Sequence, residues 1–445
     1  MKNLYIVHAV DTEGPLNESL DATFIRIKEL FNIKGIPKNK KTLEDLRNGK
    51  YTKNKIKLKK IKETLNPHLL DYKKNWKEIK DNLQESCSKS FRNLQKDSFG
   101  NGWVYSWHCV DHVNFKTNPR KKTFGYHKIF DYYKNFIRKK ENLKDKIHFH
   151  FHPMSTYFES NRNASSFENS PHLHQVMCKR IIDRKWFPVV NRAGFHIERP
   201  DSNWFLEQWI PFDLSNISQK KAKNNKIDQA YEARGYDWRR ATQKWELYNP
   251  SHDDYQVPGK CRRYIGRVLG IMNRTESITL KETIKAFKRA SKGKNTMMAV
   301  TSHDFRSLKA EVEEVRKYIS IAHKRFPKVK IKFCDSLEGF RKVLNIKNPE
   351  SKRLKLSIRK IKTKNAETCF KISTLKGKVF GPQPYLAMKL KNGTYRHDNL
   401  DFGLKAGEWF YSVYEDTIKL SDIKEVAVGA ADQKGNFDIC SIKFK

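Results

Sequence analysis

The stretch His148-Phe149-His150-Phe151-His152-Pro153 alternates three imidazoles with two phenyl rings and ends on a proline. On a β-strand, successive side chains point to opposite faces, so all three histidines would share one face and both phenylalanines the other. Neutral imidazole is a good ligand for zinc and its neighbours, which makes the histidine face a candidate metal site. The alternative is a half-buried strand whose histidines form hydrogen bonds with nearby loops.

The composition sets the size and charge of the protein. The chain has 445 residues, of which 38% are hydrophobic and 12% aromatic, enough for a barrel and a smaller module. Its formal charge is +41, from 90 Lys+Arg against 49 Asp+Glu. Such a charge attracts nucleic acid, anionic glycans or membrane headgroups. The excess is spread along the chain and accompanies no nucleic-acid-binding signature. We therefore expect a basic, solvated surface and no specific nucleic-acid partner.

The cysteines and the N-terminus bear on the cellular compartment. Seven scattered cysteines, with no Cys-x-x-Cys pair, argue against a disulfide framework and against a cysteine zinc site. The apolar run Leu4–Val7 is too short for a signal peptide, and no apolar segment reaches membrane length. These features favour a cytoplasmic protein without a membrane span, and they leave its oligomeric state open.

Predicted strands and helices alternate over the first three quarters of the chain, which is the pattern of an α/β barrel. The first strand, residues 4–10, ends on Asp11-Thr12-Glu13-Gly14-Pro15. Charged residues or histidines also follow later strands, at Asp111-His112, His152, Arg192, Asp213 and His303-Asp304. Parallel barrels place their active sites at the C-terminal ends of the strands. The alternative for each of these polar residues is ordinary loop capping.

Two further segments complete the predicted organisation. Residues 19–96 form a lysine-rich, mostly helical insertion, within which 39–62 is expected to be irregular and solvated. The barrel then extends over residues 1–347. From residue 354 the pattern changes to short strands separated by Gly, Asn and Asp turns, so we expect a small β-sandwich over residues 354–445.

In their order along the chain, these residues resemble the motifs of the polysaccharide deacetylases, the NodB-like hydrolases of carbohydrate esterase family four. Asp11-Thr12-Glu13 is similar to the acidic pair of that family, and His148 to Pro153 matches its His-x-x-x-His-Pro motif. Arg192 and the dipeptide His303-Asp304 resemble two later motifs. The resemblance covers the barrel and implies a distorted (β/α) barrel with a divalent metal held by one carboxylate and two histidines. The chain departs from the family pattern at Thr12, between the two acids, and at Phe149.

The resemblance also implies a function and a set of metal ligands. It predicts a metal-dependent hydrolase that removes an acetyl group from an N-acetylated sugar or glycan precursor in surface-polysaccharide metabolism. Glu13, His148 and His152 would hold the ion, most simply zinc, with His150 as an alternate ligand because it shares a strand face with His152. The competing hypothesis is a glycan-binding protein with a catalytically degenerate barrel.

The remaining roles follow from the same resemblance. Asp11 would be the general base, oriented by Arg192, whose alternative is an ordinary salt bridge. The pair His303-Asp304 would supply the general acid, with Asp213 or Asp237 as the carboxylate that orients His303. The candidates for binding the carbohydrate are Asp111, His112, Asp213 and Trp238. Core packing is the more frequent use of tryptophan.

Overall fold

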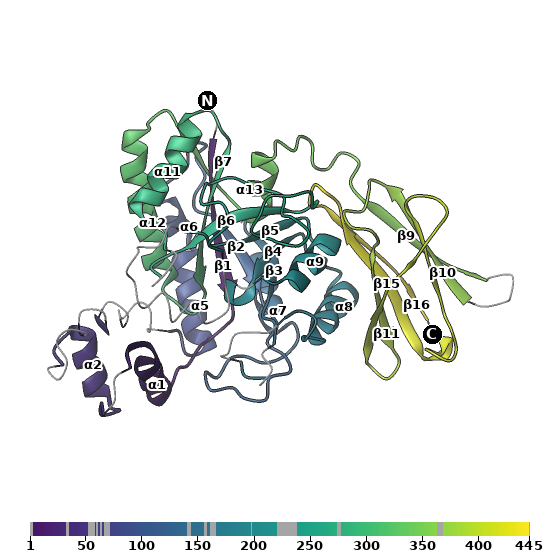
Figure 1. Cartoon of the computed structure of the whole chain (residues 1–445), viewed down its shortest axis with the longest axis horizontal. Helices are drawn as coiled ribbons and strands as arrows, with labels where there is room; N and C mark the ends of the chain where they lie inside the picture. Colours follow the sequence, from purple (N-terminus) through teal and green to yellow (C-terminus); the bar gives the residue numbers. More distant parts are fainter. Residues whose placement is uncertain are drawn as a thin grey trace.

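The computed structural model describes the chain from residue 3 to residue 444 (Figure 1). The exceptions are residues 33–34, 52–57, 59–60, 63–64, 66–71, 140–143, 155–157, 161–165, 197, 220–237, 274–276 and 363–367. In the described part, helices surround a parallel barrel, and a smaller all-β lobe lies at one side (Figure 1).

The barrel has seven parallel strands. They are β1 (Asn3–Thr12), β2 (Tyr105–Cys109), β3 (Lys146–Phe151), β4 (Val190–Ala193), β5 (Phe212–Asn216), β6 (Tyr264–Gly270) and β7 (Thr296–His303). Each strand pairs with the next in the chain, and β1 pairs with both β2 and β7, which closes the barrel. An eighth parallel strand, β8 (Lys330–Cys334), pairs with residues Asn3–Val7 of β1, whereas β2 pairs with His8–Thr12. One edge of β1 is therefore shared between β2 and β8.

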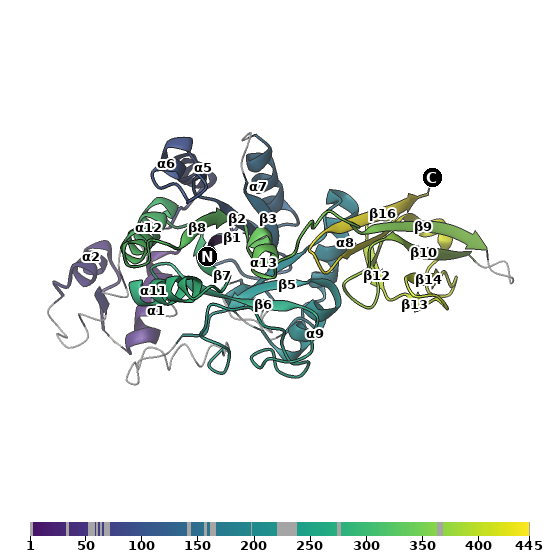
Figure 2. The same cartoon turned by 90° about the horizontal axis from the view of Figure 1, so that it is seen from above.

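Amphipathic helices cover the barrel on both sides (Figure 2). They are α5 (Trp76–Ser86), α6 (Lys89–Asn93), α7 (Lys128–Arg138), α8 (His172–Arg184), α9 (Pro200–Trp209), α11 (Leu280–Ser291), α12 (Leu308–Arg325) and α13 (Ser336–Val343), with the short 3₁₀ helix η1 (Gly194–His196) after β4. The helix α12 shows why they form. Its first turn is capped by Ser307 Oγ, and Leu308, Val312, Val315 and Ile319 bury one face at helical spacing.

The lysine-rich insertion contains α1 (Leu20–Phe31) and α2 (Lys40–Asn48) in addition to α5 and α6. The expectation of an irregular segment over residues 39–62 was wrong at its start, because Asn39 caps α2 and Leu46 on this helix is buried. Leu46 packs with Phe24 and Phe31 of α1 in a small separate apolar cluster. Part of the predicted segment falls outside the described residues.

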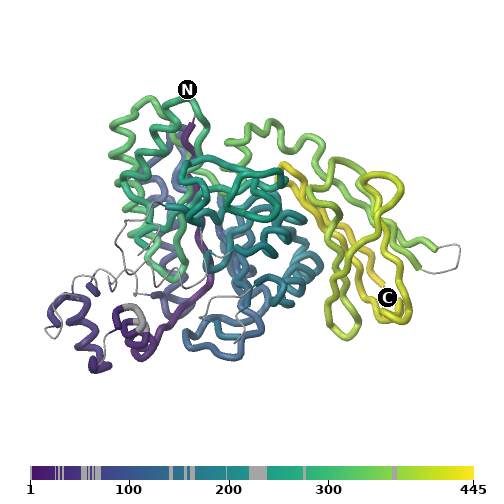
Figure 3. Tube along the Cα trace, viewed as in Figure 1, coloured from purple at the N-terminus to yellow at the C-terminus, as the bar shows by residue number. Residues whose placement is uncertain are grey.

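The C-terminal lobe is sandwich-like and antiparallel. One sheet joins β13 (Asp401–Phe402), β14 (Glu408–Ser412), β10 (Thr368–Lys376) and β9 (Lys355–Lys362), and the other joins β12 (Tyr395–Asp398), β11 (Tyr385–Leu390), β15 (Ile423–Ala431) and β16 (Phe437–Lys443). Phe370, Ile372, Leu386 and Val426 belong to the apolar core that both sheets share. The Cα trace shows this lobe at one side of the barrel (Figure 3), and the predicted boundary near residue 347 falls between α13 and β9.

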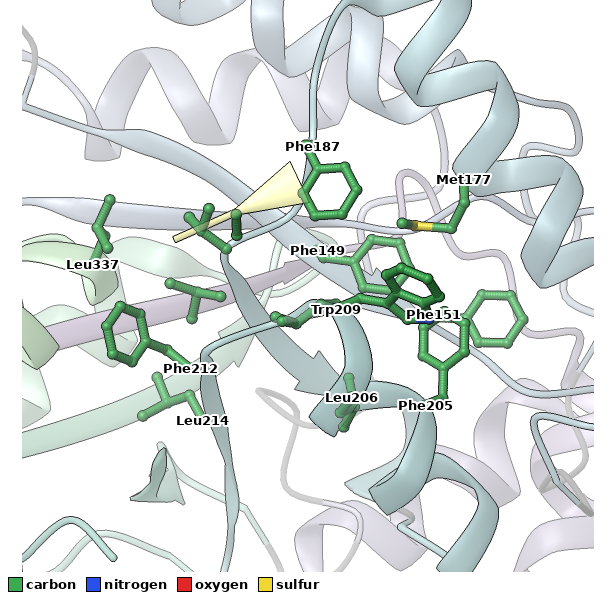
Figure 4. Close-up of a cluster of buried hydrophobic side chains, with 14 of the residues drawn as sticks. Phe149, Phe151, Met177, Phe187, Phe205, Leu206, Trp209, Phe212, Leu214 and Leu337 are labelled. Carbon is green, nitrogen blue, oxygen red and sulfur yellow. The ribbon is translucent and has the colours of Figure 1, made fainter. Parts of the chain in front are cut away.

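The second sheet of the sandwich also packs against the barrel helix α8. Tyr395 Oη donates to Asp183 Oδ1 at 2.7 Å, and His174 Nδ1 lies 2.8 Å from Tyr385 Oη. Behind α8, the rings of Phe149 and Phe151 lie in the main apolar core (Figure 4). The alternation expected for β3 is therefore present, since the two phenylalanines face the helices and the histidines face the opposite way.

Within the described residues, the structure contains no helix that combines the length and the apolar character needed to cross a membrane.

Candidate metal centre

The site begins with the last two histidines of the alternating stretch. His150 lies on the inner face of β3 and His152 directly after the strand's last residue, and their Nε2 atoms are 2.9 Å apart. From the end of β1, Glu13 places its Oε1 3.5 Å from His152 Nε2. One ligand atom from each of the three lies within 4.8 Å of the other two, and all three residues are buried. Two ligands on a tetrahedral zinc ion lie about 3.3 Å apart, so these spacings suit such an ion.

The protonation of these histidines also suits a cation. His150 Nδ1 lies 2.8 Å from the carbonyl oxygen of Arg192, and this hydrogen bond requires the proton on Nδ1. Nε2 is then the atom of His150 that a metal would take, and it lies 2.9 Å from His152 Nε2. Burial lowers the pKa of His152 well below its usual value, so this imidazole is neutral. A carbonyl that orients a ligand histidine in this way is typical of metal sites.

His148, predicted as a metal ligand, lies elsewhere. Its Nε2 is 3.5 Å from Asp335 Oδ1, and its ring is 5.1 Å from that of His108. Because β3 is extended through Phe151, His148 and His152 are separated by about 13 Å of strand. A pair spaced by four residues converges on a helix or turn, whereas a strand brings together residues spaced by two. The alternate ligand His150 therefore takes the place of His148.

The two carboxylate oxygens of Glu13 face different neighbours. Oε1 faces His152 and lies 3.7 Å from His303 Nε2. Oε2 accepts a hydrogen bond from Lys122 Nζ at 2.7 Å and lies 3.8 Å from His112 Nε2. Burial alone would raise the pKa of Glu13, but the Lys122 ammonium leads the charges that hold it well below its usual range. Glu13 is therefore an anion with one oxygen available to a metal.

Asp11 and Arg192 form a buried ion pair beside the metal-ligand cluster. Arg192 Nε lies 3.0 Å from Asp11 Oδ1, and its Nη1 donates to the Leu214 carbonyl at 3.2 Å. Arg192 Nη2 lies 2.7 Å from His196 Nδ1, at the end of η1. Asp11 Oδ1 is also 3.9 Å from His150 Nδ1. The guanidinium is thus fixed by the backbone of β5 and by η1, and it holds Asp11 next to the candidate ligands.

His303 is the member of the group that is most open to solvent. It ends β7 directly beside Asp11 in the strand register, and its side chain is 24% exposed. Its ring stacks on Phe305 with centroids 4.8 Å apart. Burial of the remaining ring surface lowers the pKa of His303 below its usual value. An incoming molecule would therefore meet a neutral imidazole at the mouth of the barrel.

Asp304, predicted as a catalytic partner of His303, has a different position. Its carboxylate accepts hydrogen bonds from the backbone nitrogens of Glu13 and Gly14, at 3.0 and 2.9 Å, and from Tyr133 Oη at 2.8 Å. Burial raises the pKa of Asp304 to about 7. The side chain is fully buried and occupied by these donors, so it positions the turn that carries Glu13.

Three predicted carbohydrate-binding residues are engaged inside the protein instead. Asp111 pairs with Arg180 Nη2 at 2.9 Å, and Asp213 with Arg263 Nη1 at 2.7 Å. Trp238 is 3% exposed and donates its indole N–H to the His196 carbonyl. Asp111 follows β2 as predicted, but Asp213 is the second residue of β5 and lies near its start, because β5 runs on to Asn216. A buried arginine neutralises each carboxylate. Asp237, the other carboxylate considered for orienting His303, lies outside the described residues.

The fourth of these residues, His112, does reach the site, and sequence reasoning missed two others. His112 approaches Glu13 as described above. Lys122 lies in a loop and had no distinguishing signal among so many lysines, while His196 follows Arg192 by four residues in a turn. The residues that the structure gathers around the site are Asp11, Glu13, His112, Lys122, His150, His152, Arg192, His196 and His303.

A buried histidine outside the metal site, His8, makes the stability of the folded protein depend on pH. His8 of β1 accepts a hydrogen bond at Nδ1 from the Trp103 indole at 3.1 Å, and its Nε2 lies 2.7 Å from Ser302 Oγ. Burial lowers the pKa of His8 to about 3. The unfolded chain takes up this proton near pH 6.5 and the folded chain does not, so stability is lost as the pH falls below 6.5.

We expect the free energy of unfolding to fall by about 1.4 kcal/mol per pH unit from His8 alone between pH 6 and 4. Glutamine can keep both hydrogen bonds without binding a proton, so His8→Gln should flatten the profile by that amount. Urea denaturation at several pH values measures the slope in both proteins. Equal slopes would show that His8 does not carry the effect.

Comparisons of the chain with protein-family models, with curated proteins and with solved structures find no significant match. The fold and the site alone therefore define the class of protein. It is an α/β barrel with a candidate Glu/His metal site and a β-sandwich-like C-terminal lobe.

Proposed function

We propose that the protein is a metal-dependent hydrolase that removes an acetyl group from an N-acetylated sugar or glycan precursor, as a divergent relative of the polysaccharide deacetylases. The observation that carries the proposal is the convergence of Glu13, His150 and His152 beside the Asp11–Arg192 pair. A carboxylate and two imidazoles can hold a divalent ion while leaving room for substrate and water. Nitrogen and oxygen donors together favour zinc without excluding its neighbours.

The other residues supply the groups that amide hydrolysis needs. A divalent ion held by Glu13, His150 and His152 would polarise the acetyl carbonyl and make water more acidic. Asp11, held in place by Arg192, would accept the proton of the attacking water. His303 would take up a proton and pass it to the leaving amine at the barrel mouth, where its side chain is partly exposed. Arg192 would act through Asp11 as a positioning residue.

The first test separates the proposed base from the ligands. Asp11→Asn should keep bound zinc but lower acetate release from N-acetylated sugars by about 10²–10⁴-fold, because asparagine cannot accept the proton. Zinc content by elemental analysis and acetate release are measured on the same preparations. Glu13→Gln is the matched control and should lose zinc. If Asp11→Asn loses zinc while Glu13→Gln retains it, the two acids have exchanged roles.

A second candidate function is supported by Lys122. Its ammonium already neutralises Glu13 at 2.7 Å, which is an arrangement that could replace a metal in a catalytically degenerate, glycan-binding barrel. The two proposals differ in metal content. The hydrolase should copurify with, or take up, about one zinc ion per chain at neutral pH. A chain that takes up no divalent ion yet binds N-acetylated oligosaccharides would favour the binding protein.

A further inference from the structure

His148, the histidine of β3 that the metal cluster does not use, lines a cavity. This cavity has a volume of about 280 Å³ and lies at the start of β3, whereas His152 follows the end of that strand. Its walls also come from α7, the segment before β4, the start of α13 and the turn between β15 and β16. Most of the lining is apolar and includes Phe130, Trp186, Val189 and Phe437.

The sandwich side of this cavity is fixed firmly to the barrel. Arg341 of α13 donates to the Lys434 carbonyl and to Asn436 Oδ1, both at 2.7 Å. Gly435, between them, has φ +75°, and a Cβ there would lie 2.4 Å from Leu337 Cδ1. The turn therefore approaches the barrel as closely as its backbone allows. A ligand would enter a preformed cavity and would contact both the barrel and the sandwich.

The polar and charged groups of the cavity indicate which ligand charge it would accept. His148 has a side chain that is 1% exposed, and its Nε2 faces Asp335 Oδ1 at 3.5 Å. Lys134 and Lys146 belong to the lining. The Lys134 ammonium donates to the Arg184 carbonyl at 3.5 Å, and Lys146 Nζ is 3.3 Å from the buried Asp335. Asp145 is already paired with Arg92 at 2.7 Å. Within the described residues, Asp335 is the one carboxylate that forms an ion pair with either lysine, so the two lysines keep a net positive charge beside an apolar cavity.

We propose that this cavity binds a small amphipathic carboxylate. Its apolar body would lie against Trp186, Val189 and Phe437, and its carboxylate would meet Lys134 and Lys146. The volume is at the lower end of that of small-molecule sites, which suits an acid with a short chain or a single aromatic ring. A cationic ligand would be repelled by the lysines, and a neutral one would leave their charge unmatched. The site is independent of the metal centre and of the function proposed for it.

The test uses octanoate as the probe and the full chain as the protein. Calorimetric titration should show saturable binding of one octanoate per chain, with octylamine and octanol binding at least about tenfold more weakly. Val189→Trp fills the cavity and should abolish binding while zinc uptake stays unchanged. Binding that does not saturate by about 5 mM, or equal binding of all three probes, would overturn the proposal.

A surface variant keeps the test decisive even where Val189→Trp does not fold. Lys134 is exposed on α7, so Lys134→Ala should fold normally and weaken octanoate binding by about fivefold. Lys139→Ala, at the C-cap of the same helix and outside the cavity, is the matched control and should not change the affinity. Equal affinity in the two variants, or retained binding in folded Val189→Trp, would place the octanoate elsewhere.

Discussion

Alanine at His152 should remove bound zinc and acetate release together, whereas alanine at His148 should leave the zinc content at one ion per chain. His152 lies within ligand distance of Glu13 and His150, while His148 lies beside Asp335 at the other end of the strand. Zinc sites with four protein ligands are worth about 10–16 kcal/mol, so one ligand accounts for about 3 kcal/mol and about a hundredfold in affinity. The proposed reaction needs the ion, so activity should fall with it.

The same experiment distinguishes the geometric ligand set from the sequence motif. The motif spacing designates His148 and His152, and the structure designates His150 and His152. Zinc affinity is measured by competition with a chromophoric chelator, and folding of each variant by circular dichroism. His150→Ala should resemble His152→Ala. If His148→Ala instead loses zinc while His150→Ala retains it, the extended course of β3 would be incompatible with the metal-bound protein.

The alternation of β3 was predictable because strand geometry depends only on local sequence. Two phenylalanines on one face and three histidines on the other follow directly from the period of two. The choice between His148 and His150 depended on where the strand ends, which the sequence did not determine. A turn beginning at His148 would have favoured the spacing of four, but β3 continues to Phe151. The position of Pro153 limits the strand without fixing its last residue.

The sequence predicted where polar residues lie at the ends of strands, but it did not predict which residues pair with them. Asp11, Glu13, His152, Arg192 and His303 all follow or end parallel strands, so closure of the barrel brings them to one rim. Asp111 obeys the same rule, whereas Asp213 lies near the start of β5, and Arg180 and Arg263 neutralise the two carboxylates inside the protein. Each arginine lies at least 50 residues further along the chain. No local pattern indicates which carboxylate such a distant arginine will reach.

Lys122 could not be predicted from the sequence for a related reason. Its ion pair with Glu13 is the feature of the site that best distinguishes the two proposed functions. Its loop is held by Asn118, whose side chain bonds both the backbone N–H and the carbonyl of Lys122. The lysine side chain is 4% exposed and ends 2.7 Å from Glu13 Oε2. It therefore acts as a built-in cation that supports a buried carboxylate in the absence of metal. A metal on Oε1 would add a second cation to the same carboxylate.

Methionine at position 122 should accordingly destabilise the metal-free protein and strengthen zinc binding. Removing one partner of a buried ion pair costs about 3–5 kcal/mol, because the other charge is left unpaired. Zinc would supply the missing positive charge, so it should stabilise Lys122→Met more than the wild type. Urea denaturation with a chelator and with excess zinc measures both effects on each protein.

A double variant shows whether the effect comes from Glu13. In Lys122→Met combined with Glu13→Gln, no charge is left unpaired, so the metal-free protein should recover most of the stability lost in Lys122→Met, and zinc should no longer stabilise it. The coupling energy from this cycle isolates the pair from the packing of the methionine. Weaker zinc binding in Lys122→Met would mean that the ammonium holds Glu13 in place for the metal. Unchanged binding would mean that Glu13 does not contribute a ligand, and the ligand set of Glu13, His150 and His152 would then be wrong.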